Sequence, residues 1–204
     1  GDKETFVRIF ALDKEQHTYM LRVFGFLSYF YIRCPQQLDT SRYEDIANFF
    51  RKIPIGDKGE KCSYVKHEVV KKESVMNYKP KGKREEDFIK IYLKDPRHVP
   101  KLKEYLLEIR HIERVQFDGL TDNEDSYIFE ANMAFALRFM IDKGIVGMGW
   151  IHIPAGCFKL LDLNQSRSMC QVAISLNHQD IKAHGEEEPQ WSEIAPHRIM
   201  SFDI

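Results

Sequence analysis

The feature that most constrains the fold is the order of strand-like and helix-like segments between Leu27 and Phe117. Strand-like segments alternate apolar and polar residues, because successive side chains of a strand point to opposite faces. These segments are 27–34, 62–70, 88–94 and 112–117. One helix-like segment follows the first of them and another follows the third. This order predicts a ferredoxin-like βαββαβ unit over residues 27–117, a topology that RNA-recognition modules share.

The two helices of this unit carry start signals. Ser41 followed by Glu44 forms a capping box, and apolar residues at helical spacing follow from Tyr43. Asp95 and Pro96 predict the start of the second helix, with Asp95 as the cap. Its predicted buried stripe is Val99, Leu102, Leu106 and Ile109.

The rest of the chain is predicted to be rich in strands. Thr5–Leu12 and Gln16–Val23 form an alternating hairpin, and further strands are expected near 149–153, 157–161 and 170–176. Asn132 is expected to cap a helix that runs to Lys143 and stops at Gly144. Because nearly all residues from 133 to 141 are apolar, this helix is predicted to be buried between layers. The fold class is therefore α+β, with residues 1–26 and 118–196 forming a β-rich part around the ferredoxin-like part.

Charge is unevenly distributed along the 204 residues, although the net charge is only −1. Between Lys66 and Lys103 twelve Lys and Arg residues face six acids, so this region alone is positive. Its exposed basic segment indicates an anionic partner, and a solvated loop explains it equally well. The candidate phosphate contacts in that segment are Lys79, Lys81, Lys83 and Arg84.

Other function classes find little support in the composition. The four cysteines form no Cys-x-x-Cys pair and the eight histidines support no ligand cluster, so we expect reduced thiols and no zinc site. No apolar run approaches the ~20 residues that cross a membrane, so no membrane partner is expected. The polar start lacks the apolar core of a signal peptide.

The final residues, Ile199–Ile204, read as a short apolar strand that carries one carboxylate, Asp203. A strand with Asp-x-Glu can hold a pair of catalytic metal ions, because residues two apart share a face. The second acid is absent, so we expect the chain to stop just before a metal-dependent nuclease site is complete. A solvated aspartate that ends a strand is the plainer explanation for Asp203 taken alone.

Several segments resemble family B DNA polymerases, especially their delta-type replicative branch. Residues 129–150 resemble the helix that precedes the exonuclease domain, and Trp150 with Pro154, Ala155 and Gly156 resembles the segment after it. Residues 191–204 resemble the approach to the first exonuclease motif. Further matches follow the family's order at 25–31, 74–78 and 88–92.

This resemblance implies an N-terminal polymerase domain, with 197–204 as the truncated first strand of the exonuclease domain. Asp203 would be the first metal-binding acid of a 3′–5′ proofreading exonuclease, a catalytic residue only when the missing acids join it. The fragment would hold no cofactor itself, whereas the parent enzyme would use Mg²⁺. It would scaffold the exonuclease and polymerase domains in the nucleus and be inactive alone. Implied partners are template-primer DNA, the other domains of the enzyme, accessory subunits and a sliding clamp.

Two alternatives stay open. A free-standing nucleic-acid-binding module of RNA-recognition-like topology would need base-stacking aromatic residues on its sheet, and Phe88 and Tyr92 are the candidates. A structural role for both rings is the simpler interpretation, because the glycines that normally accompany such a platform are missing. A complete small nuclease would need a further acid cluster, and no motif surrounds the acids in 118–130 or 180–193.

Overall fold

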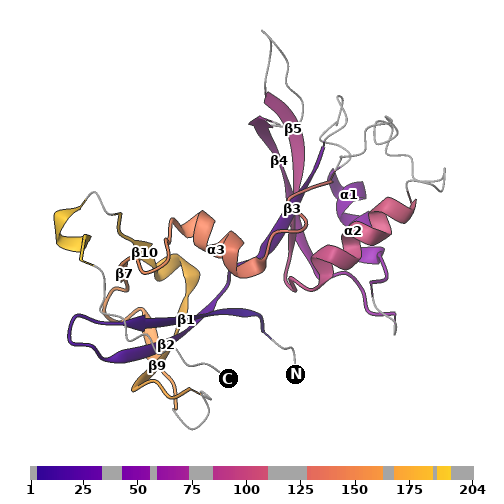
Figure 1. Ribbon diagram of the computed structural model, residues 1–204. Helices are drawn as coiled ribbons and strands as arrows, with labels where there is room; N and C mark the ends of the chain where they lie inside the picture. The colour runs from indigo at the N-terminus through magenta and orange to yellow at the C-terminus, as the bar shows by residue number, and fades with distance from the viewer. Residues whose placement is uncertain are drawn as a thin grey trace, which may run out of the picture. The chain divides into compact units, whose positions relative to one another are not determined.

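The structure is a computed structural model that describes residues 4–33, 43–55, 59–73, 85–109, 128–162, 168–185 and 188–193. It divides into two compact units, shown in Figure 1. Unit 1 contains residues 1–26 and 134–204, and unit 2 contains residues 27–133. The described residues 128–133, which belong to the segment that the sequence assigned to the β-rich part, fall in unit 2. The predicted exonuclease strand 197–204 lies outside the described residues.

Unit 2 is a four-stranded antiparallel sheet with the strand order β4-β5-β3-β6. The elements follow along the chain as β3 (Ser28–Arg33), α1 (Tyr43–Lys52), β4 (Tyr64–Glu73), β5 (Glu85–Leu93), α2 (His98–Ile109) and β6 (Ile128–Phe129). The first five elements appear in the order that the sequence predicts. The strand expected over 112–117 lies outside the described residues, and the strand that pairs with β3 is β6.

Both helices of unit 2 pack on one side of its sheet (Figure 1). Their buried faces include Ile46 and Phe50 on α1 and Leu102 on α2. The sheet contributes every second residue, for example Phe30 and Ile91, both 0% exposed. The alternating pattern thus divides each strand into a face that meets the helices and a face that does not.

The start of α2 differs slightly from the prediction. The helix begins at His98 rather than at Pro96, and residues before it form a turn. The Asp95 carboxylate accepts a hydrogen bond from the backbone N–H of Arg97 at 2.9 Å, so Asp95 closes this turn. Val99, Leu102 and Leu106 are buried as predicted, and the Ile109 side chain lies outside the described part.

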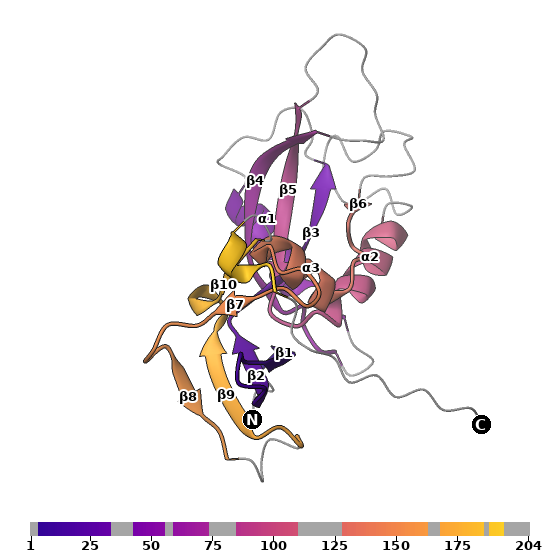
Figure 2. The same cartoon turned by 60° about the vertical axis from the view of Figure 1, so that its left-hand side comes forward.

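Unit 1 is built around a second four-stranded sheet with the order β1-β2-β9-β8, visible in Figure 2. β1 (Phe6–Leu12) and β2 (Thr18–Phe24) form the predicted hairpin, in which Leu12 pairs with Thr18. β9 (Val172–Asn177) pairs with β2 in parallel and with β8 (Phe158–Leu160) antiparallel.

Smaller elements complete unit 1. β7 (Ile151–His152) pairs with β10 (Lys182–Ala183), and two short 3₁₀ helices, η2 (His178–Asp180) and η3 (Pro189–Trp191), lie near the chain's end. The unit has its own apolar core, made of Val7, Leu21, Val23, Phe139, Ile174, Leu176 and Ile181.

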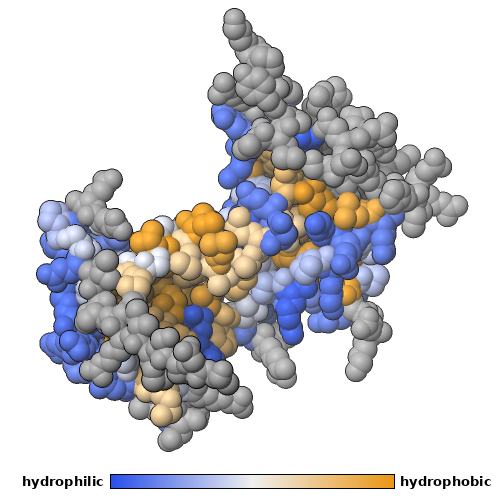
Figure 3. All heavy atoms as spheres, in the orientation of Figure 1, coloured by the Kyte–Doolittle hydropathy of each residue, from blue (hydrophilic) through white to orange (hydrophobic). Residues whose placement is uncertain are grey.

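The remaining helix, α3 (Phe135–Lys143), corrects two predictions. Its N-cap is Ala134 without a side-chain hydrogen bond, so Asn132 is not the cap. Among its side chains Phe139 is 1% exposed, but Leu137 and Ile141 are 49% and 57% exposed. The helix is therefore buried on one side only, and Figure 3 shows hydrophobic residues gathered on the surface where α3 lies.

The predicted stop of α3 at Gly144 is confirmed. Gly144 adopts the left-handed conformation with φ 63°, and its N–H donates to the carbonyl of Ile141. The next N–H, of Ile145, donates to the carbonyl of Met140 at 2.8 Å, so the carbonyls of Met140 and Ile141 are satisfied. In the described part of the chain, none of the helices has the length and apolar character needed to cross a membrane.

Candidate functional site

The candidate metal-binding and phosphate-contacting residues from the sequence lie outside the described part of the structure. These are Asp203, Lys79, Lys81, Lys83 and Arg84. The residues that flank the basic segment are described: Glu73 at the end of β4 pairs with Glu85 at the start of β5. The segment therefore connects two neighbouring antiparallel strands of unit 2.

The most distinctive described surface is the face of the unit 2 sheet opposite the helices, which we call the tyrosine face. Strand alternation places every second side chain of each of the four strands on this face. The residues of the tyrosine face are Tyr29, Tyr31, Arg33, Lys66, Glu68, Val70, Lys72, Glu86, Phe88, Lys90, Tyr92 and Phe129.

Aromatic rings form the floor of this face. Tyr29 lies with its ring centroid 5.6 Å from those of both Tyr31 and Tyr92. Tyr31 meets Phe88 edge to face at 6.5 Å, and Phe88 meets Phe129 at 5.3 Å. The floor is closely packed, since Tyr29, Tyr31 and Phe88 are only 7%, 4% and 4% exposed. Aromatic pairs in such offset or edge-on geometry stabilise one another beyond the area they bury.

Lysine ammonium groups lie over these rings. The Nζ of Lys90 is 3.7 Å from the centroid of Tyr29 and 4.8 Å from that of Tyr92. The Nζ of Lys66 is 4.7 Å from the Tyr92 centroid, and that of Lys72 is 5.1 Å from the Tyr31 centroid. Cations are attracted to the negative face of an aromatic ring, so the rings hold the ammonium groups in place.

Two acids complete the tyrosine face. Glu68 accepts hydrogen bonds from Lys66 and from the Tyr92 hydroxyl, and these bonds hold the pKa of Glu68 below its usual value. Glu86 forms an ion pair with Arg33 at 3.2 Å. The face therefore carries four cations and two carboxylates.

Sequence reasoning found only part of this surface. It named Phe88 and Tyr92 and assigned both a structural role, which agrees with the burial of Phe88. It missed Tyr29 and Tyr31. The available signal was their spacing, because two tyrosines two residues apart in a strand must share a face.

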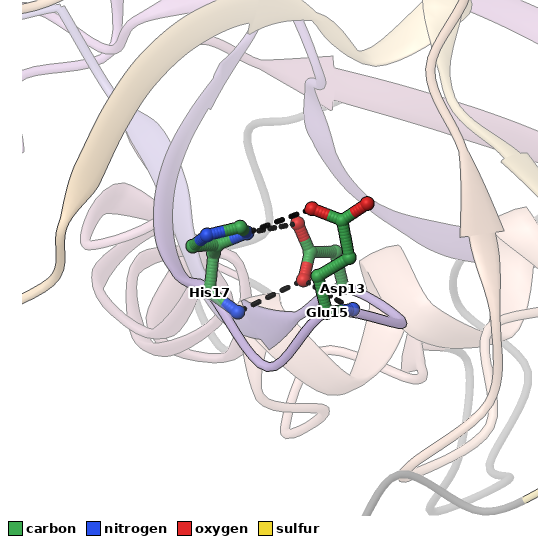
Figure 4. Close-up of side chains that lie close together, drawn as sticks. All are labelled: Asp13, Glu15 and His17. Carbon is green, nitrogen blue, oxygen red and sulfur yellow. Dashed lines mark hydrogen bonds and ion pairs between the residues drawn. The ribbon is translucent and has the colours of Figure 1, made fainter.

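A second cluster lies in the β1–β2 turn of unit 1 and is shown in Figure 4. The carboxylate of Asp13 accepts hydrogen bonds from the backbone N–H groups of Glu15 and His17 at 2.9 and 2.8 Å. Its other oxygen lies 2.9 Å from Nδ1 of His17, and a carboxylate oxygen of Glu15 lies 3.6 Å from the same nitrogen. Asp13 thus organises the turn.

These contacts shift the pKa values in the turn. The hydrogen bond and the charge of Asp13 raise the pKa of His17. For Asp13, burial raises the pKa, but the hydrogen bonds from His17 and Tyr19 outweigh burial and lower it overall.

Asp13, Glu15 and His17 are also residue types that bind divalent metals, and one ligand atom of each lies within 4.8 Å of the others. The sequence interpretation saw no such cluster. However, all three side chains are already explained by the hydrogen bonds and charges of the turn.

An aromatic stack in unit 1 involves residues near β7, β10 and η3. The imidazole of His184 stacks on Trp191 at 4.3 Å and on His152 at 6.1 Å. Trp150 donates from its indole N–H to the carbonyl of Glu193, which ties the end of the described chain to the unit. The arrangement is explained by packing of the strand ends.

Comparison with known proteins shows which family of proteins this chain resembles. The family model for the DNA polymerase family B exonuclease domain matches residues 126–204. The fold of 85% of this chain is similar to 19% of the family B DNA polymerase from the hyperthermophilic archaeon Pyrobaculum calidifontis, with a TM-score of 0.54 and 21% identity. The chain belongs to family B of the DNA polymerases.

Within that family its sequence is similar to proteins named DNA polymerase delta catalytic subunit. It is 34% identical to the one from Oryza sativa subsp. japonica over 205 residues, covering 97% of this chain and 17% of the relative. It is 31% identical to the one from Plasmodium falciparum over 201 residues, covering 97% of this chain and 18% of the relative. The chain therefore spans less than a fifth of the length of these relatives.

Proposed function

We propose that this chain is the N-terminal domain of a delta-type catalytic subunit, a DNA-directed DNA polymerase with a 3′–5′ proofreading exonuclease. The observation that carries the proposal is similarity to delta catalytic subunits over 97% of the chain. The match of residues 126–204 to the exonuclease-domain model supports the link to proofreading. In this proposal the domain scaffolds the exonuclease and polymerase domains of the longer enzyme, which acts in the nucleus.

For the exonuclease, we propose that Asp203 is one of the acids that bind Mg²⁺, together with acids from outside this chain. A pair of bound metal ions would activate the attacking water and stabilise the leaving oxygen of the phosphodiester. A single carboxylate does not hold such a pair, so the chain alone is expected to be inactive.

For DNA contact, we propose that Lys79, Lys81, Lys83 and Arg84 touch single-stranded template, since phosphate contacts need only positioned positive charge. We also infer that unit 2 is a ferredoxin-like insertion; its strand order and its two helices on one face support this inference. Accessory subunits and a sliding clamp are the further partners proposed for the whole enzyme.

The test of the proposed function is Asp203→Ala in the full-length polymerase. Degradation of a mismatched primer should fall at least 100-fold, while extension of a matched primer should continue. Glu104→Gln, a change at an exposed residue of α2, should alter neither activity. Mg²⁺- or Mn²⁺-dependent cleavage by the purified chain alone, abolished by Asp203→Asn, would contradict the proposal that the site needs further acids.

A second candidate function is a free-standing nucleic-acid-binding module, and the specific observation that favours it is the tyrosine face. Binding of single strands by this chain that is tight, and independent of any other polymerase domain, would support the module.

A further inference from the structure

We propose that the tyrosine face of unit 2 binds the phosphodiester backbone of single-stranded DNA through the ammonium groups of Lys66, Lys72 and Lys90. The rings beneath these lysines act as a support and do not stack on bases. The inference rests on the proposed function only for the choice of DNA as the ligand. The site itself follows from the geometry of the face.

The tyrosine face has an excess of positive charge. The face carries the cations Lys66, Lys72, Lys90 and Arg33 against the carboxylates of Glu68 and Glu86. Each carboxylate already forms an ion pair with one of the cations. The face as a whole is therefore positive and complements a polyanion.

The ammonium groups of the tyrosine face are more accessible than the rings beneath them. Tyr29 and Tyr31 are almost fully buried and Tyr92 is half-buried, and lysine ammonium groups lie over all three rings. A base could stack on Tyr29 only after displacing the Lys90 ammonium from its position 3.7 Å above the ring. Lys66 and Lys72 are exposed, so phosphate groups can approach the ammonium layer without any rearrangement of the floor.

The three lysines are spread along the length of the sheet. Lys66 and Lys72 lie on one face of β4, six residues apart, which corresponds to about 20 Å along the strand. Lys90 on β5 is paired with Glu68, between those two positions. Along the strand direction the lysines thus come in the order Lys66, Lys90, Lys72, with Lys90 on the neighbouring strand, as expected for contacts to one extended backbone. Such contacts position a strand without reading its sequence.

The experiment measures fluorescence anisotropy of a labelled oligo-dT strand and of an abasic phosphodiester strand of equal length, with this chain, from 50 to 200 mM salt. Both strands should bind with similar affinity, because the bases are not recognised. The three phosphate contacts of the face should contribute about −2 to the slope of log K against log salt for single strands.

The decisive variant is the triple change Lys66→Gln, Lys72→Gln and Lys90→Gln. It should weaken binding at low salt at least tenfold and reduce the magnitude of the salt slope by about 2. The matched control, Lys52→Gln, Lys101→Gln and Lys103→Gln, removes the same charge from the helices on the opposite side of the sheet and should bind like the parent. The corresponding triple Lys→Arg variant of the face should restore binding, which separates a role of charge from a loss of folding.

Several outcomes would overturn the inference. Equal affinity of the parent and the triple Gln variant would show that these lysines do not contact the strand. An equal loss of affinity in the control variant would show that only the net charge of the chain matters. Oligo-dT binding ten times tighter than the abasic strand would show base stacking, and a tenfold preference for RNA or for duplex would exclude single-stranded DNA as the ligand. Because the assay needs no catalysis, its failure leaves the Asp203→Ala test of the proposed function unaffected.

Discussion

The rings of Phe26 and Phe139 meet edge to face in unit 1, with their centroids 5.3 Å apart and their planes at 84°. Phe26 follows β2, and Phe139 lies on the buried side of α3. This contact fastens the helix to the end of the hairpin. Phe135, one turn earlier on α3, also contacts Phe26, at 5.6 Å, but is only half-buried.

The two phenylalanines of α3 should therefore differ in their importance for stability. Phe139→Ala should lower the free energy of unfolding by about 3–5 kcal/mol, because it removes a fully buried ring and leaves a cavity. Phe135→Ala should cost about 1–2 kcal/mol, since part of its ring is already in water. Urea denaturation followed by circular dichroism measures both, with the exposed Leu137→Ala as a control expected within about 0.5 kcal/mol of the parent. Equal losses for the two phenylalanines would mean that the Phe135 ring is as deeply buried as the Phe139 ring.

The end of α3 should tolerate a methyl group at one glycine and not at another. Gly144→Ala should destabilise the chain by about 1–2 kcal/mol, because φ at this position is 63° and a Cβ is strained there. Gly147→Ala is the matched control: its φ is not in the strained region and a Cβ would meet no atom within 4 Å. That control should be neutral or slightly stabilising, by up to about 1 kcal/mol. Thermal unfolding of the two variants decides; a stable Gly144→Ala would argue against the left-handed stop.

The turn cluster should respond to pH. The pKa of His17 is raised on folding, so its contribution to stability is complete below the ordinary histidine pKa and is lost as pH rises through the folded value. The pKa of Asp13 is lowered, so its contribution is present above the ordinary value and is lost as pH falls through the folded value. The turn is therefore most stabilised between about pH 4 and pH 6.5.

An NMR titration of the histidine ring signals tests this. Asp13→Asn should bring the pKa of His17 down toward its ordinary value, whereas Glu15→Gln should have a smaller effect, because Glu15 is the weakest contributor. The pKa of His178 serves as an internal reference, because it is lowered by burial and, to a smaller extent, by the charge of Lys143. A His17 pKa that ignores Asp13→Asn would rule out the hydrogen bond as its cause.

The cysteines should differ in reactivity. The Cys62 thiol is buried, and burial raises its pKa to about 11, so little thiolate is available at neutral pH. Cys157 and Cys170 are half-buried and lie in unit 1. Iodoacetamide at pH 8 under native conditions should label these two well before Cys62, as read by mass spectrometry. Rapid labelling of Cys62 in the native state would show that its region opens readily.

The local elements were predictable, because the pattern of apolar residues reports whether a segment is a strand or a helix. The hairpin of β1 and β2, the helix α1 and the stop at Gly144 all follow from such patterns. The pairing of β2 with β9 was not predictable in this way. Nothing in residues 18–24 specifies 172–177 as their parallel neighbour, since strand pairing is decided by the packing of the whole sheet.

The burial of α3 was mispredicted for a related reason. A run such as residues 133–141 shows that a helix is apolar but not which of its sides the rest of the protein covers. The structure covers the side with Phe139 and leaves Leu137 and Ile141 exposed. The tyrosine face was missed because sequence reasoning examined β5 alone, whereas the surface needs Tyr29 and Tyr31 from β3 beside Lys90. The site residues Asp203, Lys79, Lys81, Lys83 and Arg84 stay predictions, since they lie outside the described residues.

The parallel pairing of β2 with β9 also bears on how the chain reaches its native state. The register joins Tyr19 to Val172, so the sheet of unit 1 closes only after all of unit 2 has been synthesised. Unit 2 takes its partners from residues 27–133 alone and can collapse earlier. During that interval β2 has only β1 beside it, and its other edge offers unpaired backbone groups to any neighbouring strand. The interval before β9 emerges from the ribosome is thus when unit 1 is most exposed to mispairing and aggregation.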